Sequence, residues 1–178
     1  MITGKPFLNA KDIQSKVNEL ALQISEDYEG KEILAVGILK GAFMFFSDLL
    51  RRIQVPVSVD FLIASSYVKT DTSGTIKLHA DLREDIRDKH LLLVEDIIDT
   101  GLTINYIREM LLARKPASLK ICAFLDKVSR RKVELPIDYT GYKIPDHYVV
   151  GYGLDYENKF RNLPYIAIFK ERLNRDSA

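Results

Sequence analysis

Apolar residues recur at intervals of three and four near the start of the chain, at Ile13, Val17, Leu20, Ala21 and Ile24. This spacing is typical of an amphipathic helix, because residues three and four apart share one helix face. Asn9, followed three positions later by Asp12, is typical of a capped helix start. The pattern predicts a helix over about residues 10–28.

The pattern then alternates between strand and helix. Residues 32–38 form a short, apolar, β-branched run that ends near Gly41, and helical spacing returns at Ala42, Phe45, Phe46, Leu49, Leu50 and Ile53. Further strands are predicted at 57–63, 91–95 and 119–125, and a further helix carries Ile104, Ile107 and Leu111. Strands that alternate with helices indicate an α/β fold, with a mainly parallel, twisted sheet flanked by helices.

Beyond Lys127 the pattern changes to short strands separated by Gly and Pro, predicted at 139–142, 147–152 and 165–169. We interpret this tail as a small subdomain appended to the sheet. The length of 178 residues, 47% of them hydrophobic, suits a single domain with a substantial core.

Charge and composition narrow the classes of function. Lys and Arg number 26 and Asp and Glu number 25, so the net charge of +1 gives no global field for nucleic acid or an anionic membrane. The chain has neither a signal-peptide pattern nor a long apolar run, and we expect a cytoplasmic protein with no membrane partner. The single cysteine, Cys122, lies in an apolar run and is expected to be a buried, inert thiol.

Ligands of open parallel sheets bind beyond the carboxyl ends of the strands, so the residues there are the first candidates for a binding site. Residues 93–103 read Leu-Val-Glu-Asp-Ile-Ile-Asp-Thr-Gly-Leu-Thr, an apolar strand that runs into acids and then into a hydroxyl-rich turn. Glu95 and Asp96 are suited to accept hydrogen bonds from two vicinal sugar hydroxyls, or to approach a hard cation. The plainer interpretation of such a pair is a strand that ends in solvated acids.

The turn at 99–103 suits a phosphate. It opens a predicted helix, whose free N–H groups and dipole attract anions, and Thr100 and Thr103 add hydroxyl donors. Gly101 allows a positive φ or a close backbone approach. An ordinary helix cap would explain the turn alone, but the combination with two adjacent acids is less common.

Residues 94–103 resemble the phosphoribosyl-pyrophosphate signature of the type I phosphoribosyltransferases. The residues Val-Glu-Asp-Ile-Ile-Asp-Thr-Gly at 94–101 are similar to the form of this motif in the hypoxanthine-guanine branch of the family. Further segments match in the expected order along the whole chain: Leu-Lys-Gly-Ala-Phe at 39–43, Ser-Ser-Tyr at 65–67, Asp-Lys at 126–127, Val-Val-Gly-Tyr-Gly-Leu-Asp-Tyr at 149–156 and Phe-Arg at 160–161. The resemblance implies the type I phosphoribosyltransferase fold, with a core of about 8–126 plus 165–170 and a hood of mainly 127–164 with the N-terminal segment.

The resemblance also implies the subsites for the activated sugar. The phosphoribosyl group would contact Glu95, Asp96, Asp99, Thr100, Gly101, Leu102 and Thr103. The pyrophosphate would contact Leu39, Lys40, Gly41, Ser66, Tyr67 and Arg161, with a cis peptide between Leu39 and Lys40. Taken alone, Lys40 would be a solvent-facing cation and Arg161 a partner in a surface salt bridge.

A long polar loop is predicted at 64–81, and the resemblance implies that Ser66 and Tyr67 close it over pyrophosphate as a lid. The purine would contact Ile97, Lys127, Tyr148, Val149 and Asp155, with Lys127 donating to the 6-oxo group and Tyr148 stacking on the ring. Without the resemblance, Lys127 would belong to a solvated basic run, Tyr148 to the core and Asp155 to a turn.

The implied reaction is purine salvage with Mg²⁺ as cofactor, held by Glu95, Asp96 and Asp155. Hypoxanthine or guanine would be converted to IMP or GMP, with Asp99 as the general base. A helix-capping role is the plainer interpretation of Asp99. The family's members are commonly homodimers or homotetramers, which we expect here too.

Three other interpretations stay open. The first is a regulatory protein that senses phosphoribosyl pyrophosphate and binds nucleic acid elsewhere, for which the near-neutral charge gives no support. The second is a non-catalytic protein on the same fold, which the combination of Asp99, Lys127 and Asp155 disfavours. The third is a transferase for another base, and the preference among hypoxanthine, guanine and xanthine is open.

Overall fold

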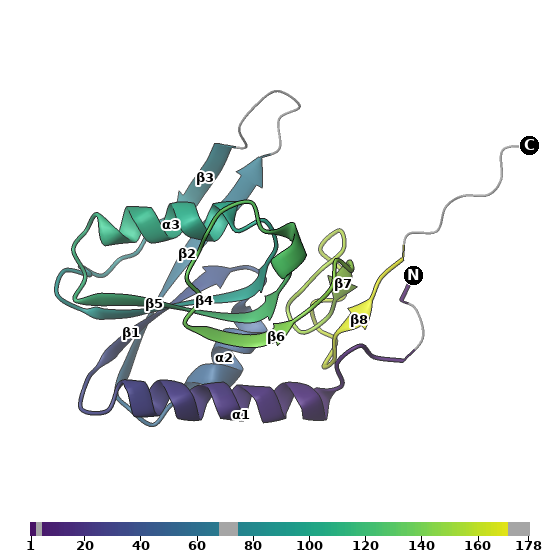
Figure 1. Ribbon diagram of the computed structural model, residues 1–178, viewed down its shortest axis with the longest axis horizontal. Coiled ribbons are helices and arrows are strands. Elements are labelled where there is room, and N and C mark those ends of the chain that lie inside the picture. The colour runs from purple at the N-terminus through teal and green to yellow at the C-terminus, as the bar shows by residue number, and fades with distance from the viewer. Residues whose placement is uncertain (3–4, 68–74, 171–178) are drawn as a thin grey trace, which may run out of the picture.

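The computed structural model describes residues 1–2, 5–67 and 75–170 (Figure 1), and helices and strands alternate along the first part of the chain, up to residue 67. The helices are α1 (Ala10–Asp27), α2 (Phe43–Leu50) and α3 (Leu102–Leu112), with a short 3-10 helix η1 (Val128–Arg130). The strands are β1 (Ile33–Leu39), β2 (Val57–Tyr67), β3 (Thr75–Ala80), β4 (His90–Ile98), β5 (Ser118–Asp126), β6 (Tyr139–Lys143), β7 (Val149–Val150) and β8 (Ala167–Ile168).

Strands β1 to β6 form the main sheet in the order β3-β2-β1-β4-β5-β6. Neighbouring strands pair in parallel, except that β3 runs antiparallel to β2 at one edge. Helices α1 and α2 lie on one face of this sheet and α3 lies on the other (Figure 1). The predicted α/β fold, with a mainly parallel sheet flanked by helices, is confirmed.

The central strands are apolar on both faces. In β1, Ile33 and Ala35 pack with α1 and α2, whereas Leu34 and Val36 pack with α3. Successive side chains of a strand point to opposite faces, so a sheet covered on both sides needs such continuous apolar runs. Cys122 of β5 is fully buried in this core, and burial raises the pKa of its thiol, as expected for an inert cysteine.

Helix α1 begins where the sequence predicts. The side chain of Asn9 accepts hydrogen bonds from the backbone N–H groups of Lys11 and Asp12, at 2.9 and 3.0 Å. In return, the Asp12 carboxylate accepts from the Asn9 N–H at 3.2 Å. This reciprocal capping satisfies N–H groups that have no partner inside the helix, and it confirms the predicted start.

The predicted loop at 64–81 is instead largely a β-hairpin. Strand β2 continues through Tyr67, and β3 pairs back along it from Thr75 opposite Tyr67 to Ala80 opposite Ile63. The ladder is made of backbone hydrogen bonds, so a polar sequence with one solvated face can form it. Residues 68–74, at the centre of the predicted lid, lie outside the described residues.

Three strand placements differ from the predictions. Strand β4 continues to Ile98, beyond the predicted end at 95, so Glu95 and Asp96 lie within the strand and not at its end. Strand β6 was expected in the hood but pairs with β5 in the main sheet, and β8, expected with the core, pairs with β7 in a separate two-stranded sheet. The partner of a short strand is chosen by long-range backbone pairing, which local composition does not specify.

The N-terminal segment pairs with the residues on either side of β8. The backbone of Leu8 pairs with that of Ile166, and Ile2 bridges Phe169. The N-terminal segment therefore lies with β7 and β8 (Figure 1), as the predicted hood requires, while the full division into core and hood stays a prediction. In the part of the chain that the structure describes, no helix has the length and apolarity needed to cross a membrane.

Candidate active site

A cavity of about 540 Å³ opens at the carboxyl ends of β1, β4 and β5, beneath the β7 segment. An adjoining hollow of about 400 Å³ lies over the turn between β4 and α3. The first is lined by Leu39, Lys40, Gly41, Glu95, Asp96, Ile97, Asp99, Thr103, Lys127, Tyr148, Val149, Asp155 and Arg161, together with Ile38, Ala64, Ser65 and Leu154. The second adds Thr100, Gly101 and Leu102.

These two hollows bring together every residue predicted for the site except Ser66 and Tyr67. The backbone of both residues lies in β2, but their side chains are outside the described part of the chain. Ser65, the residue before them, does line the cavity, and its hydroxyl lies 2.7 Å from Nε2 of His79 on β3. The fold brings these residues close together, whereas their individual roles stay predictions.

Two adjacent acids, Glu95 and Asp96, form the floor of the cavity within β4. Their carboxylates accept backbone hydrogen bonds, Glu95 from the Asp96 N–H at 3.2 Å and Asp96 from the Ile97 N–H at 2.8 Å. Asp96 is only 9% exposed. Burial raises the pKa of both carboxyls, and the neighbouring Asp96 charge raises that of Glu95 further. The interpretation as solvated acids is therefore wrong.

The turn after β1 approaches these acids closely. The peptide between Leu39 and Lys40 is cis, as predicted, and the Lys40 side chain is exposed. Gly41 lies directly against Asp96, and a Cβ atom at this position would overlap the Asp96 carboxylate. The absence of a side chain at Gly41 is what lets the backbone of this turn reach the floor of the cavity.

The turn after β4 has the geometry predicted for a phosphate loop. Gly101 precedes α3 with a φ of 81°, and an added Cβ would lie 2.9 Å from Cδ of Arg131. The N-cap residue Gly101 has no side chain to cap α3, and the Leu102 N–H donates a long hydrogen bond to Thr100 Oγ1 at 3.4 Å. Asp99 does not cap the helix, and that interpretation is wrong. The free N–H groups and the helix dipole suit an anion.

Lys127 stands at the end of β5, where its N–H donates to the Ile98 carbonyl at 2.9 Å. It is only 7% exposed. Its ammonium lies 3.8 Å from a carboxylate oxygen of Asp99 and 3.4 Å from one of Asp146. A buried ammonium needs such partners, and the interpretation of Lys127 as part of a solvated run is wrong.

The opposite wall comes from the segment around β7. Tyr148 is 53% exposed, so the interpretation as a core aromatic is wrong, and its ring stands edge-on to that of Tyr156 at 5.8 Å. Val149, the next residue, is buried in β7. The exposed face of Tyr148 is free to stack on a planar ligand in the cavity.

Asp155 and Arg161 meet at the far end of this wall. An Arg161 guanidinium nitrogen lies 2.7 Å from an Asp155 carboxylate oxygen, and another donates to the Gly153 carbonyl at 2.7 Å. The second Asp155 oxygen accepts from the Asn158 N–H at 2.7 Å. Asp155 therefore stabilises a turn and Arg161 forms a salt bridge, as their plainer interpretations state, and both also line the cavity.

The predicted metal ligands do not form one cluster. Among the described residues, no three His, Cys, Asp or Glu side chains are grouped to hold a metal ion. Mg²⁺ is commonly held by one or two carboxylates together with substrate phosphates. Glu95 and Asp96 fit that role, because two buried neighbouring carboxylates with raised pKa values gain from a divalent cation.

Arg130 and Asp146 were not predicted, yet they lie beside Asp99 and Lys127 in the site. Arg130 donates to Asp99 at 2.9 Å and lies 3.5 Å from Asp146. Arg130 ends η1, three residues after Lys127, and residues i and i+3 eclipse in a 3-10 helix. The three-residue spacing of Arg130 from Lys127 is the feature of the sequence that could have indicated Arg130. The residues next to Asp146 in the sequence do not indicate its partners.

Comparison with known proteins agrees with this geometry. The family model described as "Phosphoribosyl transferase domain" matches residues 5–157. The hypoxanthine phosphoribosyltransferase of Salmonella typhimurium is 50% identical over 168 residues, which cover 93% of this chain and 94% of that protein. The hypoxanthine-guanine phosphoribosyltransferase of Staphylococcus aureus is 48% identical, with 92% of each chain covered.

A solved structure extends the likeness to the fold. The crystal structure of a hypoxanthine-guanine phosphoribosyltransferase from Bacillus anthracis superimposes with a TM-score of 0.91 at 46% identity, covering 96% of this chain and 100% of that one. The chain therefore belongs to the type I phosphoribosyltransferase family, in the branch of the hypoxanthine and hypoxanthine-guanine phosphoribosyltransferases.

Proposed function

We propose that the chain transfers the 5-phosphoribosyl group from phosphoribosyl pyrophosphate to hypoxanthine or guanine, giving IMP or GMP and pyrophosphate. One observation carries the proposal: two adjoining hollows bring together two acids whose pKa values burial raises, a helix start whose N-cap residue has no side chain, and a buried lysine beside an aspartate. The relatives from Salmonella typhimurium and Staphylococcus aureus, whose matches cover more than nine-tenths of this chain, are named as hypoxanthine and hypoxanthine-guanine phosphoribosyltransferases. These names support the choice of substrates.

The sugar and its 5′-phosphate would bind at the β4 end. Glu95 and Asp96 are near enough to the turn to accept from the two ribose hydroxyls while the phosphate lies on the free N–H groups of α3. The turn residues Thr100, Gly101, Leu102 and Thr103 would surround the phosphate, with hydroxyl donors from the two threonines.

The pyrophosphate would leave toward the β1 turn. The backbone of Leu39, Lys40 and Gly41 borders the cavity there, and Arg161 reaches it from the opposite wall. To bind pyrophosphate, the guanidinium would exchange part of its contact with Asp155 for phosphate oxygens, which its planar fork matches. Ser66 and Tyr67 of the β2–β3 hairpin would close over the leaving group and exclude water.

The purine would lie between Tyr148 and Ile97, with its 6-oxo group toward Lys127. An ammonium donates hydrogen bonds only, so it favours a 6-oxo acceptor over the 6-amino group of adenine. Val149 and Asp155 also line the cavity, and they would border the remaining edge of the purine ring.

Mg²⁺ fits beside the sugar, with Glu95, Asp96 and Asp155 as the residues that would hold it, directly or through water. When bound, it would neutralise charge on the pyrophosphate leaving group. The residues of the chain do the rest: the phosphate turn fixes the sugar, and the walls of the cavity orient the base against it.

The chemical step would be a displacement at the anomeric carbon. The purine N9 forms the new bond, the bond to pyrophosphate breaks, and its electron pair leaves with the pyrophosphate. The proton carried by N7 of the base would pass to Asp99, whose carboxylate stands at the head of the phosphate turn beside Lys127.

The assembly is proposed to be a homodimer or homotetramer. Strand β2 exposes three apolar side chains in alternation, Val59 at 52%, Phe61 at 40% and Ile63 at 36%. An exposed apolar face of this kind suits burial against a second copy. The cytoplasmic location predicted from the sequence is part of the same proposal.

A panel of bases tests the function. With phosphoribosyl pyrophosphate and Mg²⁺, the protein should form nucleotides from hypoxanthine or guanine and at least about 100-fold less from adenine. Lys127→Gln should reduce that discrimination, whereas Glu109→Gln on the exposed side of α3 should leave it unchanged. If no base in the panel, xanthine included, is converted to a nucleotide, a sensor or a non-catalytic protein is the correct interpretation.

A further inference from the structure

Four charged side chains form a closed ring at the base end of the cavity. Asp99 and Asp146 alternate with Lys127 and Arg130, at N–O separations of 3.8 and 3.4 Å for the lysine and 2.9 and 3.5 Å for the arginine. Each acid therefore faces both cations, and each cation faces both acids.

Two members of this ring stand outside the cavity lining. Asp99 and Lys127 line the cavity, whereas Arg130 and Asp146 do not, and both pair with Asp99 or Lys127 in the ring. Arg130 and Asp146 can therefore act on a bound purine through Asp99 and Lys127.

Asp146 is suited to hold the ammonium of Lys127. The Lys127 side chain is 9% exposed, and Asp146 accepts its hydrogen bond at 3.4 Å. Asp99 is the second acid near this ammonium, at a greater distance. Because Lys127 has little water around it, a change at Asp146 alters where its ammonium rests.

Arg130 is suited to hold the carboxylate of Asp99. It donates through Nε to one Asp99 oxygen, while the other oxygen faces Lys127. Both oxygens are thereby directed by cations on the η1 side, which limits the orientations that the carboxylate can take. A base that accepts a proton from a ligand works best in one fixed orientation.

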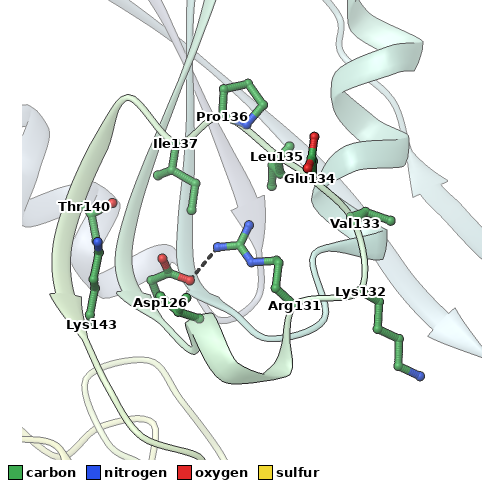
Figure 2. A pocket seen from close by; sticks show the side chains of 11 residues that line it. Asp126, Arg131, Lys132, Val133, Glu134, Leu135, Pro136, Ile137, Thr140 and Lys143 are labelled. Atoms are coloured by element: carbon green, nitrogen blue, oxygen red, sulfur yellow. Dashed lines mark hydrogen bonds and ion pairs between the residues drawn. The ribbon is translucent and has the colours of Figure 1, made fainter.

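The backbone that carries Arg130 is itself anchored. The neighbouring Arg131 points inward to a buried ion pair with Asp126, across a wide hollow of about 930 Å³ beneath the crossover from β5 to β6 (Figure 2). The Lys132 N–H donates to the Thr100 carbonyl at 2.9 Å, which ties the same segment to the phosphate turn. Arg130 therefore projects from a segment fixed on both sides.

We propose that Arg130 and Asp146 are positioning residues of the purine subsite. Asp146 sets the Lys127 ammonium for the 6-oxo group, and Arg130 sets the Asp99 carboxylate for the proton of the base. The inference rests on the function proposed above for Asp99 and Lys127, and it assigns a role to two residues that do not line the cavity.

Steady-state kinetics of Asp146→Asn and Arg130→Gln test the inference. Asp146→Asn should raise the KM for hypoxanthine about three- to tenfold and leave the KM for phosphoribosyl pyrophosphate within about twofold. Arg130→Gln should lower kcat about three- to tenfold, because the base is present but less well oriented. The double variant should lose less than the product of the two single effects, since both act in one ring.

The controls separate positioning from general stability. Glu84→Gln breaks an ion pair with Lys89 of similar exposure far from the cavity, and it should change neither parameter. Charge-conserving Arg130→Lys and Asp146→Glu should recover part of the lost kcat and KM, even if the neutral variants lower the unfolding temperature.

Several results would overturn the inference while leaving the proposed function intact. These are an active wild type whose variants keep kcat and purine KM within about twofold, a rise in kcat for Arg130→Gln, or equal losses in the Glu84 control. A wild type that converts no base at all would instead overturn the proposed function.

Discussion

Two pairs of acids line one cavity but differ in their electrostatic state. Glu95 and Asp96 lie side by side in β4, accept hydrogen bonds from the backbone N–H groups of Asp96 and Ile97, and have pKa values that burial raises. Asp99 and Asp155 each pair with an arginine, at 2.9 and 2.7 Å. No ion pair is described for the first pair, on which Arg161 acts only as a charge near Asp96, whereas each acid of the second pair forms an ion pair with an arginine.

This difference indicates a division of labour. Buried like charges are costly, and the cost falls when a cation or sugar hydroxyls bind beside them. Acids paired with arginines gain less from an added cation, and the arginine orients them before any ligand binds. We therefore expect Glu95 and Asp96 to act mainly by binding the metal ion and the sugar. We expect Asp99 to act mainly in the proton transfer from the base.

Removal of divalent metal gives the largest expected effect. Chelation with EDTA should lower nucleotide synthesis by about 10³-fold or more, because charge on the leaving pyrophosphate would no longer be neutralised. Added Mg²⁺ should restore the rate, as measured by IMP formation from hypoxanthine. Full activity in EDTA would show that the acid pair serves the sugar alone.

Asp99→Asn should have the next largest effect. It keeps the shape of the side chain but removes the proton acceptor, and kcat should fall about 10²- to 10³-fold. Binding of phosphoribosyl pyrophosphate and the unfolding temperature should change little. Near-normal turnover by a folded Asp99→Asn protein would remove Asp99 from the role of base.

Glu95→Gln should have the smallest effect of the three changes, and the effect should be on the stability of the fold. A carboxyl whose pKa is higher in the folded than in the unfolded state destabilises the fold at high pH, and this cost disappears as pH falls toward the ordinary value of 4.5. The variant should therefore unfold about 2–4 °C above the wild type near pH 8, without ligands, and the gain should vanish near pH 4.5.

Calorimetry of the two proteins across this pH range measures the effect, with Glu84→Gln as an exposed control. A Glu95→Gln protein that is no more stable than the wild type at pH 8 would show that the chain already neutralises the acid pair. The contrast between the two pairs of acids would then be wrong.

The sequence predicted the parts of the site that lie close together along the chain. The strand, turn and helix that carry Glu95, Asp99 and Gly101 follow one another within a short segment, so local pattern and residue type were enough. The positive φ of Gly101 follows from the same local requirement.

The parts that could not be predicted depend on distant partners. Arg130 meets Asp99 and Asp146 across 31 and 16 positions, and no local pattern encodes such a pairing. The β2–β3 hairpin and the pairing of β6 with β5 were not predicted from the sequence, for a related reason. A polar strand is stabilised by hydrogen bonds to the backbone of its neighbour, which can lie far away in the sequence.

The central claim is that this cavity binds phosphoribosyl pyrophosphate, and isothermal titration calorimetry measures this most directly. In the presence of Mg²⁺, the protein should take up about one phosphoribosyl pyrophosphate per chain, with saturable heat and weaker binding when EDTA replaces the metal. No heat of binding at millimolar ligand and abundant Mg²⁺ would contradict the account.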